Sequence, residues 1–195
     1  MNERLIKDCF KLIIEQGLGL SLDDPNLVGT PERMAKMYRH IFRNAKMECK
    51  PKLTKFPNEE NIQELIMLDR IHFVSWCSHH FLPFEGYAWM GYIPDKFVIG
   101  ASKPSRLIEH YSACPNLQEF LCMNCIKEFD KQIEPKGTIL VMRAIHSCMR
   151  CRGVKQSGGA GMITSSLSGV LKKDAKARAE AMDLIKLSMM QGMIE

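Results

Sequence analysis

Residues 65–93 read LIMLDRIHFVSWCSHHFLPFEGYAWMGYI, and this stretch decides the fold class. Its first part, residues 65–76, is rich in apolar and β-branched side chains and shows some alternation. Its second part, residues 81–93, has the same character, with a turn expected at Glu85-Gly86. Short apolar runs of this kind indicate buried or half-buried strands. We therefore predict two neighbouring strands on either side of Cys77-Ser78-His79-His80.

The rest of the chain adds two helices, two strands and a closing helix. The helices are predicted at residues 102–112 and 117–133, the strands at 137–148 and 162–167, and the closing helix at 174–190. A Gly/Ser-rich stretch, residues 157–161, precedes the last strand. Hairpins that enclose two helices predict an α+β protein with an antiparallel ββααββ unit. Helices on one face of a four-stranded sheet leave the other face in need of a partner, which favours an oligomer.

The N-terminal part of the chain reads as helical. Apolar residues recur at helical spacing from Leu5 to Ile13. Thr30-Pro31 then resembles an N-cap followed by a proline at the first helical position, which predicts the start of a second helix. We therefore divide the chain into an N-terminal helical region, residues 1–56, and an α+β domain, residues 57–195.

Composition narrows the classes of function. The 195 residues include 27 Lys and Arg against 22 Asp and Glu, a net charge of +5. This mild basic excess suits an anionic small molecule and is too diffuse to predict nucleic-acid binding. No apolar run is long enough to span a membrane, and the first residues lack a signal-peptide pattern, so we expect a cytoplasmic protein. In that compartment the eight cysteines are expected to be thiols or metal ligands.

Two segments far apart in the sequence carry the residue types that bind zinc. Cys77 and His80 are three positions apart, so a tight turn can point both at one ion, and Cys148 completes a set of two thiolates and one imidazole. That set leaves a fourth position for water, as in catalytic zinc sites. Cys151 allows a second interpretation, in which all four side chains form a closed structural site. If the segment around Cys148 is a strand, Cys148 and Cys151 project to opposite faces, which disfavours the closed site.

Two histidines stand beside these presumed ligands. His79 and His146 each lie within two positions of one of them. A single histidine is more often structural, but two in this context favour acid–base chemistry.

Other polar residues are suited to binding an anionic substrate. A hydroxyl and two cations, Ser102, Lys103 and Arg106, stand at a predicted helix start, where phosphate binds well. Arg152 belongs to a second basic cluster, although either cluster alone is equally well explained as solvated surface. Glu119 lies early in a helix, where the helix dipole also favours an acidic residue.

Six segments together make the chain resemble the GTP cyclohydrolase I family. None is specific alone, but all six occur in order and at the separations expected for that family. They are Thr30-Pro31-Glu32-Arg33-Met34-Ala35-Lys36-Met37, Cys77-Ser78-His79-His80-Phe81, Tyr92-Ile93-Pro94, Val98-Ile99-Gly100-Ala101-Ser102-Lys103-Pro104-Ser105-Arg106, Leu117-Gln118-Glu119 and His146-Ser147-Cys148-Met149-Arg150-Cys151-Arg152-Gly153-Val154.

The resemblance implies a fold, an assembly and a reaction. The fold is the tunnelling fold, whose subunits form β-barrel rings that stack into a homodecamer. The reaction opens the imidazole ring of GTP, releases C8 as formate and yields 7,8-dihydroneopterin triphosphate. By motif match, Cys77, His80 and Cys148 would bind Zn²⁺, and water activated by the zinc would attack C8. His146 would protonate N7, and His79 would assist opening of the ribose.

The resemblance also implies a set of substrate-binding residues. Glu119, with Gln118, would pair with the guanine edge, and Ser102 would contact the ribose hydroxyls. The triphosphate would be held, in part from a neighbouring subunit, by Lys103, Arg106, Arg152 and Lys52.

Three features depart from the family pattern. Ser78 stands where the family usually has glutamate. Residues 157–163 carry fewer hydroxyl side chains than expected, and Cys151 replaces a residue that is often small. Two alternatives therefore stay open: a related tunnelling-fold enzyme that acts on another purine or pterin, and a non-catalytic module with a closed structural zinc.

Overall fold

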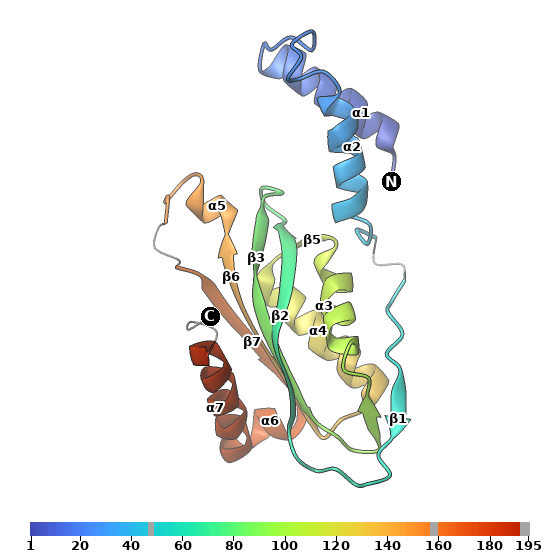
Figure 1. Ribbon diagram of the computed structural model, residues 1–195, viewed down its shortest axis with the longest axis vertical. Helices are drawn as coiled ribbons and strands as arrows, with labels where there is room; N and C mark the ends of the chain where they lie inside the picture. Colours follow the sequence, from blue (N-terminus) through green and yellow to red (C-terminus); the bar gives the residue numbers. More distant parts are fainter. Residues whose placement is uncertain (47–48, 157–159, 192–195) are drawn as a thin grey trace.

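The computed structural model describes residues 1–46, 49–156 and 160–191, so residues 157–159 of the Gly/Ser-rich stretch lie outside the described residues. It confirms the α+β class. A largely antiparallel sheet carries helices on both faces, and a pair of helices projects from one end (Figure 1). The strand order is β5-β2-β3-β6-β7. The bounds are β2 Ile66–Cys77, β3 Pro83–Ile93, β5 Pro115–Asn116, β6 Gly137–His146 and β7 Met162–Leu167.

The helices follow the predicted order, with short elements added between them. They are α1 Glu3–Leu12, α2 Thr30–Ile41, α3 Lys103–Ser112, α4 Gln118–Ile133, α5 Ser147–Arg150, α6 Gly169–Lys173 and α7 Ala175–Gln191, with a π-helical turn, η1 Ile13–Gly17, after α1. A small antiparallel ribbon joins β1 Lys55–Pro57 to β4 Phe97–Ile99. Within the described ranges, no helix combines the length and the apolar character needed to cross a membrane.

β2 and β3 form the predicted antiparallel pair. They pair along most of their length, with an irregularity between Leu68 and Ile71. The predicted turn at Glu85-Gly86 is wrong, because β3 keeps an unbroken register with β6 through these residues. A Cβ added at Gly86 would lie 1.9 Å from the backbone oxygen of Arg143. This glycine therefore permits the close approach of two strands rather than a change of direction.

The main core lies between the sheet and the helices α3 and α4. Phe84 and Tyr92 of β3 are each 1% exposed, and they pack in one cluster with Phe129 of α4. Fully burying a side chain of this size stabilises a fold by roughly 1.5–3 kcal/mol. This packing fixes the position of α4, whose first turn carries Gln118 and Glu119.

The second face of the sheet is covered over part of its length. α6 and α7 pack there against Trp89, Ile139 and Val141 (Figure 1). The Trp89 Nε1–H donates to Ser188 Oγ (2.9 Å), and the Ser188 hydroxyl donates to an oxygen of Asp69 (3.0 Å). The prediction that helices cover only one face is therefore wrong, because the C-terminal helix folds back onto the other.

The N-terminal helices contact the sheet at the turn between β2 and β3. α2 begins at Thr30, as predicted to within one residue, but its N-cap is Gly29 at φ 76° rather than Thr30. Glycine adopts this left-handed conformation without a Cβ clash. Just beyond α2, the Phe42 ring lies 5.1 Å from the ring of Phe81, and Phe42 is 4% exposed. The base of the helical region is thus anchored on the segment that carries Cys77 and His80.

The segment that joins the helical region to the sheet is held along α4. Glu128, which is 5% exposed, accepts hydrogen bonds from Lys50 Nζ (2.6 Å) and Gln132 Nε2 (2.8 Å). Gln132 in turn accepts the backbone N–H of Leu53 (2.9 Å). These contacts fix the path of the residues around Lys52. The division into two domains near residue 56 stays a prediction.

Candidate active site

Cys77, His80 and Cys148 lie together at the end of the sheet nearest α2. Their potential ligand atoms all lie within 4.8 Å of one another, and Cys77 Sγ is 3.8 Å from His80 Nδ1. Cys77 is buried, Cys148 is partly buried and His80 is exposed. The group is therefore rooted in the core on one side and open to solvent on the other.

The turn between β2 and β3 brings the first two of these residues together. The backbone N–H of Phe81 donates to Cys77 O (2.8 Å), and that of Cys77 donates to Leu82 O (2.9 Å). Phe81 has φ 53°, a left-handed conformation that is unfavourable for a bulky residue. Its ring packs against Phe42 and lies 6.4 Å from that of Tyr38. Packing against the N-terminal region therefore helps to hold the turn in this strained shape.

The short strand β5 supports the same turn from a second direction. The Ser78 N–H donates to Asn116 O (2.9 Å). The buried Asn116 amide donates to Tyr111 O (2.7 Å) and Cys114 O (3.1 Å). Hydrogen bonds to Leu82 and to Asn116 thus hold the backbone at Cys77 and Ser78. The sequence analysis missed Asn116, since no motif marks a residue that acts through its backbone and a buried amide.

Cys148 lies on a helical turn and not on a strand. β6 ends at His146, and the N–H of Cys151 donates to Ser147 O (2.9 Å) at the end of α5. The predicted strand through Cys148 is therefore wrong, and the argument from opposite strand faces does not apply. Cys151 is nevertheless exposed, and it is not part of the group of described residues that could hold a metal. Among the described residues, the group has three donors.

Burial and the neighbouring thiol of Cys77 both affect the pKa of Cys148. Burial, and next the neighbouring thiol of Cys77, raise the pKa of the Cys148 thiol, while the charge of Arg152 lowers it. Two thiolates this close are unfavourable unless a cation lies between them. A divalent cation would stabilise both thiolates, because it supplies the charge that the protein lacks at this point.

A second imidazole lies at the same end of the sheet. His146 is paired with Phe84 across β6 and β3, and the two rings stack with centroids 4.6 Å apart. His146 Nε2 lies 2.8 Å from Gln118 Oε1. Burial lowers the pKa of His146, and the charge of Glu119 acts in the opposite direction. His146, Gln118 and Glu119 are therefore brought together, although they are far apart in sequence.

The other predicted residues fall into two groups. His79 and Arg152 lie near the metal group. The His79 ring is 6.1 Å from that of His80, and the charge of Arg152 lowers the pKa of Cys148. Both side chains are exposed. Glu119, at the start of α4, is exposed as well.

Apart from Arg152, the residues predicted to bind the triphosphate and the ribose lie elsewhere on the chain. Ser102 is the N-cap of α3, and Lys103 and Arg106 belong to its first turn. Cys77 of the metal group pairs with Asn116, which follows the opposite end of this 10-residue helix, and the helix is about 15 Å long. Lys52 lies between Pro51 and Leu53, whose backbones both bond to Gln132 near the C-terminal end of α4. One chain alone therefore does not bring these four residues to the metal group.

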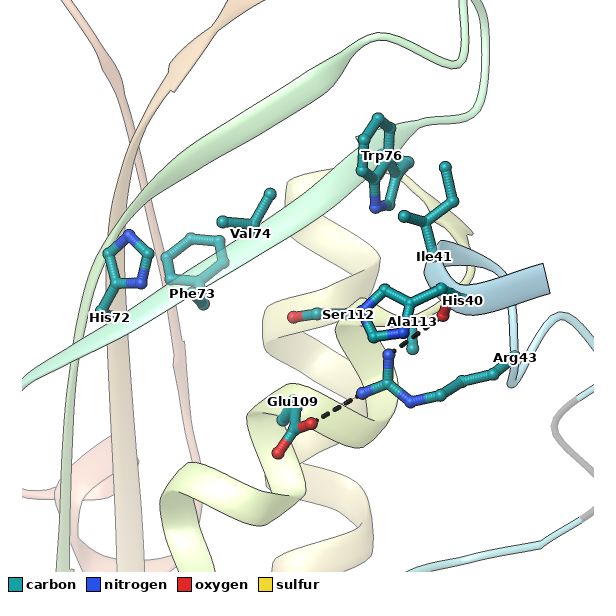
Figure 2. Close-up of a pocket in the computed structure, with 10 residues that line it drawn as sticks. All are labelled: His40, Ile41, Arg43, His72, Phe73, Val74, Trp76, Glu109, Ser112 and Ala113. Atoms are coloured by element: carbon teal, nitrogen blue, oxygen red, sulfur yellow. Dashed lines mark hydrogen bonds and ion pairs between the residues drawn. The ribbon is translucent and has the colours of Figure 1, made fainter. Parts of the chain in front are cut away.

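A separate hollow of about 350 Å³ lies between α2, β2 and α3 (Figure 2). Across it, the guanidinium of Arg43 donates to Glu109 (2.7 Å) and to the backbone oxygen of His40 (3.2 Å). Trp76 and Phe73 form part of its wall. None of the predicted site residues lines this hollow.

These features define a class of protein: an α+β chain with two thiols and an imidazole at one end of its sheet, beside a second imidazole that is partly buried. A family model described as GTP cyclohydrolase I matches residues 6–186. GTP cyclohydrolase 1 of Caldanaerobacter subterraneus subsp. tengcongensis is 37% identical over 186 residues, which cover 95% of this chain and 97% of that protein. The chain belongs to the GTP cyclohydrolase I family, and it is an enzyme of that family.

A second relative and one solved structure also match the chain. GTP cyclohydrolase 1 of Geobacillus kaustophilus is 38% identical over 190 residues, covering 95% of this chain and 98% of that protein. Among solved structures, the archaeosine synthase QueF-Like in the apo form matches 54% of this chain and 93% of that chain, at 17% identity and a TM-score of 0.42. The structural likeness is too slight to bear on function.

Proposed function

We propose that the chain is a zinc-dependent GTP cyclohydrolase I that opens the imidazole ring of GTP, releases formate and yields 7,8-dihydroneopterin triphosphate. The observation that carries this proposal is the convergence of Cys77, His80 and Cys148 within 4.8 Å beside His146. Two thiols and one imidazole are the donor types that zinc prefers, and three protein donors with one open position are typical of catalytic zinc.

Each nearby residue has a task in this reaction. When bound, zinc would supply the Lewis acidity that makes water a nucleophile near neutral pH. His146 would transfer a proton to N7 of the purine, which makes C8 electrophilic, and His79 would assist ribose opening. The carboxylate of Glu119 would accept the N1–H and 2-amino hydrogens of guanine. Adenine lacks both donors, so this contact would discriminate against ATP.

The site is proposed to lie between subunits of a homo-oligomer, most simply the decamer of this family. Ser102, Lys103, Arg106 and Lys52 lie apart from the metal group of their own chain, so a neighbouring copy would supply them. The sheet supports such an assembly. In the described part of the chain, β7 pairs only with β6, and most of β2 has one unpaired edge. Unpaired strand edges favour pairing with another chain.

A cytoplasmic location fits this proposal. All eight cysteines lie among the described residues and are free thiols there. Free thiols are maintained in a reducing compartment, and GTP is available there as a substrate.

The test is incubation of the zinc-loaded protein with GTP. We expect equimolar formate and a product that becomes fluorescent after oxidation to a neopterin. Cys148→Ser should lose both zinc and activity. Cys9→Ser, which removes an exposed thiol of α1, is the matched control and should keep both. GTP left intact by the zinc-loaded protein, or formate released equally well by the Cys148→Ser variant, would contradict the proposal.

A further inference from the structure

The side-chain amide of Gln118 is buried and its orientation is set by its neighbours. Gln118 is 1% exposed. Its Nε2 lies 3.1 Å from each of three oxygens: Met142 O, Met162 O and Thr164 Oγ1. Two of these are backbone carbonyls, which only accept hydrogen bonds. The opposite amide orientation would place Oε1 against two carbonyl oxygens, so Nε2 must face them.

This orientation determines which ring nitrogen of His146 carries a hydrogen. Gln118 Oε1 faces His146 Nε2 at 2.8 Å. An amide oxygen only accepts, so the hydrogen of this bond lies on Nε2. The Phe84 ring is 2° from parallel with the imidazole and limits its rotation. His146 Nδ1, by contrast, makes no hydrogen bond with any residue that the structure describes.

We propose that Gln118 is a positioning residue that holds His146 in the Nε2–H form, so that Nδ1 is the ring atom that exchanges protons with the substrate. This inference rests on the proposed function. It differs from the role that the family resemblance implied, in which Gln118 pairs with guanine alongside Glu119. Both N–H groups of Gln118 are directed at protein oxygens, and its oxygen is directed at His146. The exposed Glu119 is therefore the side chain left to read the guanine edge.

The same geometry explains why a glutamine is suited to this position. The amide must donate to the backbone on one side and accept from the imidazole on the other. A glutamate would place a carboxylate oxygen against Met142 O and Met162 O. A leucine or methionine would leave two buried carbonyls without this donor and would remove the acceptor for Nε2–H. Buried polar groups without partners are costly, typically by about 1–3 kcal/mol each.

The first measurement needs no substitution in Gln118. Nitrogen-15 spectra of the zinc-loaded protein with labelled histidine should show His146 as the Nε2–H tautomer with a slowly exchanging proton. The signal is assigned by its loss in His146→Asn. An Nδ1–H tautomer in the parent protein would overturn the proposal. This result does not depend on GTP turnover, so it distinguishes failure of the inference from failure of the proposed function.

The second measurement separates positioning from substrate binding. Gln118→Leu should keep its zinc and should lose the protected Nε2–H signal. Residues that orient a metal-bound histidine typically contribute about 10- to 100-fold, and we expect a fall in kcat of similar size here. KM for GTP should stay near the parent value, whereas it should rise in Glu119→Gln. A rise in KM with an unchanged kcat in Gln118→Leu would show that Gln118 binds guanine instead.

A matched variant provides a control that alters one contact of Gln118 without removing its side chain. Thr164→Val removes one of the three acceptors around Nε2 and leaves both backbone carbonyls and the His146 contact in place. It should keep the Nε2–H signal and most of kcat. If Gln118→Leu does not fold, the tautomer of the parent protein still decides the question, and loss of the signal in Thr164→Val would contradict the assigned amide orientation.

Discussion

Phe84 and His146 are register partners on β3 and β6, and their rings stack 4.6 Å apart at 2° from parallel. Phe84 is also 1% exposed and belongs to the main core. One residue therefore links the core of the sheet to the imidazole that we assign to proton transfer. His146 is thus positioned by the packing of the sheet rather than by a loop.

Phe84→Leu should separate the two roles of this residue. Loss of the ring should reduce stability by less than the roughly 3–5 kcal/mol typical of Phe→Ala in a core. It should also lower kcat, because His146 loses the surface that limits its rotation. Phe73→Leu is the control: Phe73 is buried in the same core, but its ring lies edge-on to Phe84. Urea unfolding should show similar losses for both variants, and only Phe84→Leu should reduce kcat. Equal effects on kcat would contradict the role of the stack.

The metal set can be tested through the cysteine that it excludes. Cys151→Ser should keep one zinc per subunit, with Zn–S distances of about 2.3 Å from X-ray absorption. Cys77→Ser should lose stoichiometric zinc. Cys151→Ser should keep its zinc because Cys151 is exposed and lies outside the group formed by Cys77, His80 and Cys148. Loss of zinc from Cys151→Ser would instead favour a closed site with four protein ligands.

The sequence predicted the α+β class, the order of the main elements and the convergence of Cys77, His80 and Cys148. The elements and the pair Cys77 and His80 could be predicted because apolar periodicity and short ligand spacing are local properties, whereas Cys148 was assigned by its residue type and by motif match. The sequence could not predict the contact of Gln118 with His146, because this contact depends on the register between α4 and two strands. The coverage of the second sheet face by α7 was missed for a similar reason. An amphipathic pattern shows that a helix packs, but not on which side of a sheet it does so.

The contact between Glu128 and Lys50 makes stability depend on pH. Burial alone raises the pKa of Glu128, but hydrogen bonds from Lys50 and Gln132 outweigh it, so this pKa lies below its ordinary value of 4.5. A carboxyl with a lowered folded pKa stabilises the fold above its unfolded pKa, and this contribution is lost as pH falls through the folded value. Glu128→Gln should therefore be less stable than the parent protein at about pH 6, with the difference shrinking toward pH 3.

The control for this measurement is a second ion pair of similar length. Glu109 lies 2.7 Å from Arg43, but its side chain is 69% exposed. Exposed pairs contribute roughly 0–1 kcal/mol, so Glu109→Gln should change stability little at any pH. Denaturant unfolding across the pH range measures both variants. A difference between Glu128→Gln and the parent that stayed constant with pH would show that the buried carboxylate is not the titrating group.

Glu119 should determine the choice of purine. Glu119→Gln replaces a charged acceptor, and a hydrogen bond to a charged group contributes about 1.5–3 kcal/mol. Because each 1.4 kcal/mol is about tenfold, kcat/KM for GTP should fall at least about tenfold while zinc stays bound. Glu180→Gln, an exposed change on α7, should have no effect. An unchanged kcat/KM in Glu119→Gln would mean that Glu119 only stabilises the start of α4.

The separation of Lys103 and Arg106 from the metal group predicts that inactive variants complement each other. Lys103→Ala/Arg106→Ala damages the triphosphate end, and Cys148→Ser damages the metal end. If each site combines the two ends from different subunits, random mixing in a symmetric ring leaves about a quarter of the sites intact. Co-refolded mixtures should therefore recover about that fraction of the parent rate of formate release. A mixture of Cys148→Ser with His80→Ala, both damaged at the metal end, should recover nothing. If the first mixture were no more active than the sum of its parts, each site would lie within one subunit, and the chain would have to bring α3 and the metal group together by a rearrangement.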